Sequence, residues 1–271
     1  MKTIIIIFIT FCFALPGSGQ ERINMYFHTQ SYYGFSGLTF IPNSQIFPGK
    51  QFGLSYHSEP ADGSNLSLLP YSIRIIYGID GNVVEIATTN TPYYSSDRLQ
   101  NGVTISHGIS KFDFIMPIFP SVKYQIMPLT RNNYQVGMAI GFALPYGAYY
   151  VADKYFDISV FDVTIHSGVA TKLTTYHVFA GFTFTFGDRL GEMQRSFNLE
   201  MLVEAAWGGS LKELDKKEEA FVSLSFRHAW TSSLFITTFI RYDNQPLTKK
   251  GKVLSPGPTT LMAVGLDYHI F

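Results

Sequence analysis

Large apolar residues alternate with small or polar ones along the C-terminal stretch of the chain. The larger side chains share one face of an extended strand, at Met262, Val264, Leu266, Tyr268 and Ile270. The other face carries Ala263, Gly265, Asp267 and His269. Because successive side chains of a strand point to opposite faces, this pattern predicts a strand that is apolar on one side and polar on the other. Such a strand suits a barrel that presents its apolar face to lipid and its polar face to the lumen.

The same alternation recurs in four further runs, at 134–144, 176–186, 197–207 and 222–230. A secreted β-sandwich could produce a similar pattern. Each run is about 10 residues long, however, which is the length of a tilted membrane-crossing strand, whereas strands of soluble proteins average about 5 or 6 residues. Aromatic residues recur near the ends of the runs, as the interfacial girdle of a membrane barrel requires: Tyr134, Tyr176, Trp207, Trp230, Tyr242 and Tyr268. The length of these alternating runs and the aromatic residues at their ends therefore favour an all-β fold, a transmembrane antiparallel β-barrel.

The strand count is predicted at about 12, within a range of about 10 to 14. The pattern offers about 13 candidates, and a single-chain bacterial barrel has an even number of strands. Either 35–41 is not a spanning strand, which gives 12, or 22–29 adds one, which gives 14; we predict 12. With the C-terminus on the periplasmic side, the connections expected outside are 243–259, 208–219 and 89–100. Those expected on the inner side are 231–233, 187–196, 79–82 and 145–157, of which the last is long for an inner turn.

The N-terminal residues have the pattern of a secretion signal. Lys2 is followed by a mostly apolar run from Ile4 to Leu15 and then by Pro16-Gly17-Ser18-Gly19. The run is too short to span a membrane as a helix, and the small residues after it suit a cleavage site. We therefore expect a signal peptide at 1–19 and an outer-membrane barrel at 20–271. Cys12, the one cysteine of the sequence, falls within the signal peptide, so thiol and disulfide chemistry are excluded from the mature chain.

The charge balance bears on the class of partner. The sequence holds 20 basic and 20 acidic residues, and removal of Lys2 with the signal leaves a balance of about −1. This argues against a nucleic-acid-binding protein, which usually shows a basic excess. No apolar stretch of about 18 residues follows residue 20, so a helical membrane protein is not expected. Bacterial outer-membrane lipid and lipopolysaccharide are the expected surroundings.

Three short stretches resemble the YjbH-like group of bacterial outer-membrane barrels, which is associated with exopolysaccharide. The first is Gly37-Leu38-Thr39-Phe40-Ile41-Pro42, followed by Phe47-Pro48-Gly49 and Gly53. The second is Ser121-Val122-Lys123-Tyr124-Gln125, and the third is Tyr150-Val151-Ala152-Asp153-Lys154-Tyr155-Phe156, with Asp153 where the group usually has Ser. The resemblance implies an outer-membrane barrel with a possible polysaccharide partner. Gly265, Tyr268 and Ile270 also resemble the C-terminal signal by which such barrels engage the barrel assembly machinery, although Phe271 falls on the opposite face from the apolar stripe.

A set of charged residues falls on the predicted lumen face. Its members are Arg74, Glu85, Lys123, Glu200, Glu204, Arg227, Arg241 and Asp267. The set could line an aqueous pore and tune its selectivity. It could equally fill a narrow lumen with ion pairs, because buried charges are tolerated only when they are paired. The near balance of signs favours the second alternative.

Two other functions follow from separate motifs. A barrel hydrolase that acts on lipid needs a His and a Ser at the lipid-facing rim, and His57-Ser58 and His166-Ser167 are the His-Ser pairs of the chain. Alternation places His166 on the lumen face, which argues against a catalytic role. A surface-binding protein could use the basic residues Lys249, Lys250 and Lys252 of an outer loop. No cofactor is expected and no metal cluster stands out, because the acidic residues of the 208–219 loop alternate with lysines. The predicted function is a passive channel, or a structural or export-associated component.

Overall fold

A computed structural model describes most of the barrel. The described residues are 31, 36–58, 61–62, 70–79, 83–89, 119–130, 135–143, 147–158, 161–172, 175–186, 199–210, 219–231, 233–244, 247–249, 252–255 and 259–270. The predicted signal peptide at 1–19, the alternative strand at 22–29 and most of the loop 208–219 lie outside these residues. No helix of the described part is both long and apolar enough to cross a membrane.

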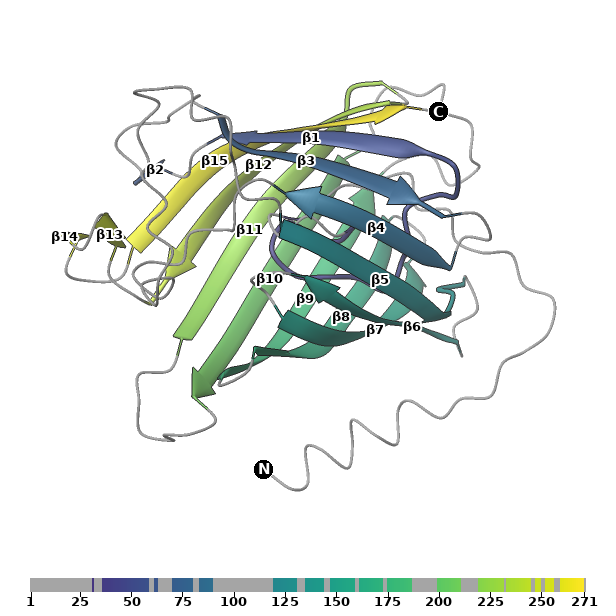
Figure 1. Cartoon of the computed structure of the whole chain (residues 1–271), viewed down its shortest axis with the longest axis horizontal. Helices are drawn as coiled ribbons and strands as arrows, with labels where there is room; N and C mark the ends of the chain where they lie inside the picture. The colour runs from purple at the N-terminus through teal and green to yellow at the C-terminus, as the bar shows by residue number, and fades with distance from the viewer. Residues whose placement is uncertain are drawn as a thin grey trace.

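Twelve antiparallel strands form one closed sheet (Figure 1). The sheet closes because the first strand, β1, pairs with the last, β15, through partners that include Phe52 with Ile270 and Tyr56 with Leu266. The barrel strands are β1 (Phe52–Ser58), β3 (Pro70–Gly78), β4 (Val84–Thr89), β5 (Phe119–Met127), β6 (Val136–Ala143), β7 (Gly147–Ile158), β8 (Phe161–Lys172), β9 (Thr175–Phe186), β10 (Leu199–Ser210), β11 (Glu219–Ala229), β12 (Leu234–Asp243) and β15 (Thr259–Ile270). The short strand β2 (Ala61–Asp62) extends one edge of β15, and β13 (Leu247–Lys249) with β14 (Lys252–Ser255) forms a separate hairpin. The prediction of a 12-stranded β-barrel is confirmed.

The outer surface of the barrel is apolar. Large hydrophobic side chains on the outward face are close to half exposed, among them Val222 at 53%, Ile270 at 50% and Ile140 at 45%. Polar residues at the alternate positions are buried inside. A closed sheet satisfies every backbone hydrogen bond without water, and an apolar exterior then suits hydrocarbon. The protein is therefore a membrane-spanning barrel of the bacterial outer-membrane type.

Aromatic side chains lie near both ends of this apolar band. At the proximal end, where β1 begins and β15 ends, Trp230 is 68% exposed and Tyr268 is 48% exposed. At the distal end, the rings of Tyr176 and Trp207 contact each other with centroids 5.4 Å apart, and Tyr242 is also exposed. These positions match the two interfaces of a bilayer. His228, between Phe226 and Trp230 in the sequence, lies half-buried at the proximal end with its ring 6.4 Å from that of Trp230.

The predicted connection at 145–157 is wrong. Most of this stretch forms strand β7, which pairs antiparallel with β6 on one side and with β8 on the other. Tyr149, Val151 and Tyr155 of β7 point into the barrel, so the rule that large apolar residues face lipid fails on this strand. With β7 in place, the strand order has β3, β9 and β11 finish at the proximal end of the barrel, and β1, β4 and β12 finish at the distal end. The tight turn at Thr231 is held by its Oγ1, which accepts the N–H groups of Ser233 (3.2 Å) and Leu234 (3.0 Å).

Candidate functional site inside the barrel

Residues 36–49 lie inside the barrel, and we call them the lumen segment. The sequence predicts 12 strands if the stretch 35–41 is not a membrane-spanning strand. Its described part, 36–41, belongs to the lumen segment and is not a strand of the barrel wall. Residues 36–47 are all buried, and the segment is visible as the purple trace within the ring of strands (Figure 1). It leaves the lumen at the proximal end, where Lys50 N–H donates to the carbonyl of Gly78 (2.8 Å) before β1 begins. Gly78 is required at this exit, because a Cβ atom there would collide with the carbonyl oxygens of Phe47 and Pro48.

The segment folds back on itself in a small hairpin. Gly37 bridges to Pro42, and Leu38 N–H donates to the carbonyl of Ile41 (3.0 Å). Gly37 permits this close approach, since a Cβ atom would lie 2.5 Å from the carbonyl oxygen of Ile41. The turn leaves several backbone N–H groups unused by the hairpin, and these must find other acceptors because they are buried.

The carboxylate of Glu204 on β10 accepts those N–H groups. Its Oε1 receives Thr39 N–H (3.0 Å), and its Oε2 receives Phe40 N–H (2.7 Å) and Ile41 N–H (3.0 Å). Three successive amides that converge on one anion form a concave anion-binding arrangement of the kind called a nest. Glu204 thus binds the tip of the hairpin by hydrogen bonds to its backbone.

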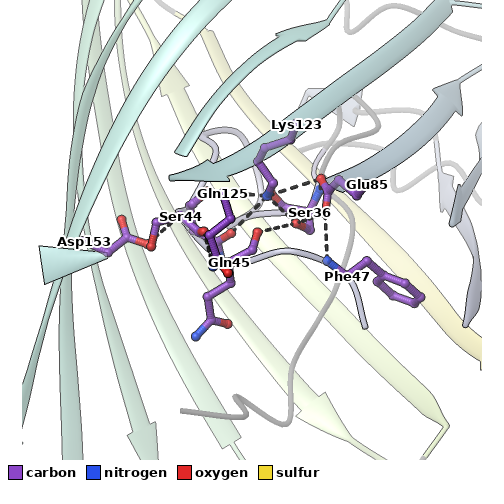
Figure 2. Close-up of polar contacts among 9 residues, drawn as sticks. Ser36, Ser44, Gln45, Phe47, Glu85, Lys123, Gln125 and Asp153 are labelled. Atoms are coloured by element: carbon purple, nitrogen blue, oxygen red, sulfur yellow. Dashed lines mark hydrogen bonds and ion pairs between the residues drawn. The ribbon is translucent and has the colours of Figure 1, made fainter. Parts of the chain in front are cut away.

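A second carboxylate holds the two flanks of the segment. Glu85 on β4 accepts Ser36 N–H (2.9 Å) and Phe47 N–H (2.8 Å), as Figure 2 shows. Lys123 on β5 is the register partner of Glu85, pairs with it at 3.2 Å and donates to the carbonyl of Ser36 (2.8 Å). This wall pair therefore presents both an acceptor and a donor to the backbone of the lumen segment.

The middle of the segment is held by β5 and β7. Gln125 Nε2 donates to the carbonyl of Ser44 (2.8 Å), and Ser44 N–H donates to Asp153 Oδ2 (2.6 Å), two contacts drawn in Figure 2. Asp153 Oδ1 also lies 2.9 Å from His166 Nδ1 on β8, whose Nε2 in turn contacts Thr183 Oγ1 (2.9 Å). A polar chain therefore runs from the segment through three strands of the wall.

Apolar contacts hold the segment at both ends of the lumen. Near the distal end, the ring of Phe40 packs edge-on against Phe239 (centroids 4.8 Å apart) and lies under the guanidinium of Arg241 (4.6 Å). Near the proximal end, Phe47 packs edge-on against His269 (5.0 Å). Two aromatic residues of the segment thus contact the wall close to the two mouths.

Small wall residues make room for the segment. At Gly181 on β9, a Cβ atom would lie 2.8 Å from Ile41 Cδ1 and 3.0 Å from Leu38 Cδ2. Leu38 and Ile41 share an apolar cluster with small inward residues such as Ala139 and Ala170. The lumen face is therefore shaped for close packing against the hairpin.

The structure places seven of the eight predicted lumen residues inside the barrel. Glu85, Lys123, Glu200, Glu204, Arg227, Arg241 and Asp267 are all at most 3% exposed. Arg74 lies on β3 opposite Ser55 in the register, and its side chain is outside the described part. Arg227 pairs with Glu200 (3.1 Å), Arg241 pairs with Asp243 (2.8 Å), and Asp267 accepts a hydrogen bond from Ser55. The structure thus pairs much of the set. It also brings Glu85, Lys123 and Glu204 into contact with the lumen segment, and Arg227 donates to the carbonyl of Gly37 (3.4 Å).

The two His-Ser pairs do not assemble a catalytic dyad in the described part. His166 is buried in the lumen and bound to Asp153, whereas Ser167 lies on the other face of β8 and donates to the carbonyl of Ala152 (3.4 Å). His57 also points into the barrel, toward Gly265. No group of three or more potential metal ligands occurs among the described residues. The basic residues Lys249 and Lys252 pair across the β13–β14 hairpin, and the side chains of that hairpin are outside the described part.

Sequence alternation did not identify the lumen segment or its partners Gln125, Asp153 and Ser225, the last of which accepts a hydrogen bond from the hydroxyl of Thr39. Alternation predicts which face of a strand a residue occupies, but it does not say what fills the lumen. One signal was present: the three stretches that resemble the YjbH-like group meet here. The first supplies the segment, the second supplies Lys123 and Gln125, and the third supplies Asp153.

Comparisons with known proteins found no matching family model and no matching curated protein. Among solved structures, the chain is similar to a KdgM porin (9% identity, TM-score 0.46, covering 82% of this chain and 99% of that one). It is also similar to a NanC porin (11% identity, TM-score 0.44, covering 80% of this chain and 98% of that one). A third similar structure is an outer-membrane channel from Pseudomonas putida F1 (10% identity, TM-score 0.44, covering 86% of this chain and 99% of that one). Because these identities and scores are low, the assignment of the fold rests on the strand pairing described above.

Proposed function

We propose that this protein is a channel of the bacterial outer membrane, closed by its own lumen segment. The observation that carries the proposal is a hairpin-shaped segment that lies inside the lumen and is bound there largely through its backbone. Side chains alone fill a barrel of about 8 strands, whereas larger barrels leave an interior that needs a ligand, a plug or water. With 12 strands, this barrel has the lumen segment as its plug.

The contacts of the plug suit a reversible closure. Glu85, Asp153 and Glu204 bind backbone N–H groups, and water can replace a hydrogen bond at a net cost of about 0.5 to 1.5 kcal/mol, or about 1.5 to 3 kcal/mol where one partner is charged. The segment also continues directly into β1 at one mouth, so it can leave the lumen toward that end without any change in the strand pairing. A lumen built for a permanent core would more simply be filled by apolar side chains.

An engineered crosslink tests whether the segment controls conduction. Thr39 Oγ1 donates to Ser225 Oγ on β11 (2.8 Å), so sulfur atoms at these positions lie within reach of a disulfide, whose S–S bond is about 2.0 Å. The sequence has no cysteine beyond Cys12 in the predicted signal peptide. Thr39→Cys with Ser225→Cys therefore gives a mature chain with one thiol pair.

The readout is single-channel conductance of the refolded protein in a planar bilayer. We expect discrete openings from the parent protein, none from the oxidised double variant, and their return after reduction; Ser225→Cys alone is the matched control. Openings that continue unchanged after oxidation would contradict a gating role. Silence of the folded, heat-modifiable parent and of variants with a loosened segment would favour a filled barrel with a structural or export-associated role.

Membership of the YjbH-like group and the partners remain parts of the proposal. The meeting of the three similar stretches at the lumen segment supports a relation to that group. The proposed orientation places the proximal end in the periplasm, so the segment would enter the barrel from the periplasmic side. Lipopolysaccharide around the distal loops, the barrel assembly machinery and a polysaccharide ligand stay predictions.

A further inference from the structure

We infer that the opened lumen admits small cations in preference to anions, and that Glu204 and Asp153 set this preference. The inference rests on the proposed function, because it concerns the lumen after the lumen segment has left. It names the class of permeant and the residues that select it.

The buried cations of the wall have carboxylate partners in the wall itself. Lys123 pairs with its register partner Glu85 (3.2 Å), and Arg227 pairs with its register partner Glu200 (3.1 Å). Arg241 binds Asp243, two residues further along β12 (2.8 Å). Since none of these pairs includes a residue of the lumen segment, all three survive its departure. Lys123, Arg227 and Arg241, the buried cations of the described wall, are therefore neutralised whether the lumen is filled or empty.

Glu204 and Asp153 are held differently. Every hydrogen bond of Glu204 among the described residues comes from the segment, through the N–H groups of Thr39, Phe40 and Ile41. Asp153 is bonded to Ser44 N–H of the segment and lies beside His166. In the described part of the chain, neither carboxylate has a Lys or Arg partner within 4.0 Å. The lumen segment supplies hydrogen-bond donors to these two carboxylates, but it supplies no positive charge to balance their negative charge.

Departure of the segment leaves both carboxylates facing the lumen. A carboxylate is acceptor-only, so water and mobile cations must replace the lost N–H donors. The buried wall side chains include five carboxylates (Glu85, Asp153, Glu200, Glu204 and Asp267) against three cations (Lys123, Arg227 and Arg241). A passage lined by one excess sign concentrates counter-ions and repels co-ions. Among the described side chains, the wall of the emptied lumen therefore carries an excess of negative charge, which attracts cations.

The test needs a protein in which the segment is released while the wall is intact. Phe40→Pro removes both the shortest N–H bond to Glu204 and the aromatic contact at the distal mouth, and it changes no residue of the barrel strands. Ile41→Pro, which removes a different N–H bond to Glu204, is an independent second release variant. Heat-modifiable migration confirms that each barrel is folded.

The measurement is the reversal potential of a released variant under a tenfold KCl gradient. We expect a cation-over-anion permeability ratio well above one in dilute salt. The ratio should decline toward one near 1 M, where the screening length falls to about 3 Å. Glu204→Gln or Asp153→Asn in the released background should lower the ratio, and Glu204→Asp should restore it relative to Glu204→Gln.

The possible failures are distinguishable. If neither release variant conducts while its barrel is folded, the proposed function fails. If they conduct but prefer anions, or show no preference, this inference fails and the gating role stands. A cation preference that neither Glu204→Gln nor Asp153→Asn alters would overturn the assignment to these two residues.

Discussion

Replacement of Glu204 by Gln should loosen the lumen segment without affecting the wall. The two carboxylate oxygens of Glu204 receive three backbone N–H groups, one at Oε1 and two at Oε2. A glutamine has one acceptor oxygen and one NH₂ group that cannot accept a hydrogen bond. Its best orientation places the oxygen toward Phe40 and Ile41, which leaves Thr39 N–H without an acceptor.

The size of the effect follows from this geometry. One hydrogen bond to a charged group is lost, worth about 1.5 to 3 kcal/mol, and two more weaken from charged to neutral, by about 1 kcal/mol each. Part of this loss is returned, because a neutral amide is easier to bury than a carboxylate. We take the net cost at about 3 kcal/mol, which raises the population of the released segment about 100-fold, since about 1.4 kcal/mol corresponds to a factor of 10.

Thiol labelling measures this population. Ser44 is buried, and its Oγ has no hydrogen-bond partner among the described residues, so Ser44→Cys adds a reporter thiol at little cost. When the segment leaves and returns quickly relative to labelling, the rate of reaction with a water-soluble maleimide follows the released fraction. We expect labelling about 100-fold faster in Glu204→Gln than in the parent.

The matched control is Glu200→Gln. Glu200 lies on the same strand and the same lumen face, but it accepts its hydrogen bonds from Arg227 and Thr185 of the wall. We expect labelling in this control to rise by much less than in Glu204→Gln. Equal labelling rates in Glu204→Gln and the parent, with both barrels folded, would refute the conclusion that this carboxylate holds the segment.

Three further substitutions have defined outcomes. Gly181→Leu should expel the hairpin of the lumen segment, because the new side chain would occupy the space now filled by Leu38. We expect frequent channel openings in a planar bilayer, and unchanged conductance would argue against close packing at Gly181. Lys123→Met leaves the buried Glu85 without its cation and should cost about 3 to 5 kcal/mol, measurable as a lower urea midpoint of unfolding. Lys50 has a positive φ of 66°, so Lys50→Gly should preserve or slightly raise stability, by about 1 kcal/mol at most, whereas Lys50→Val should lower it in the same assay.

Alternation of apolar and polar residues was sufficient to predict the barrel wall. Runs such as 176–186 and 222–230 became β9 and β11, with Phe182 and Val222 facing outward as the period of two requires. The pattern is reliable here because two contrasting solvents, lipid and a polar lumen, act on opposite faces of each strand. It failed on β7, where Tyr149 and Val151 face inward, since the lumen there is packed rather than hydrated.

The contents of the lumen could not be predicted in the same way. Residues 36–49 have no strand period, because nearly every side chain of the segment is buried whichever way it points. Its contacts are also remote in sequence, as in the pairing of Phe40 with Glu204, and no local pattern encodes them. Alternation did place Glu204 on the lumen face. The groups that donate to its carboxylate are backbone N–H groups, however, and every residue except proline carries one, so the sequence does not mark them.

The direct passage of the lumen segment into β1 has a consequence for how the molecule is made. β1 must pair with β15, the last strand of the chain, before the wall is complete. Until that seam forms, the hairpin tip has no enclosed chamber to enter, although Glu204 on β10 is already present to receive it. Contacts between such distant parts of a chain are slow to form. Barrel closure and lumen filling are therefore coupled steps, and a nascent barrel that sealed without its N-terminal stretch inside would enclose two carboxylates that lack their donors.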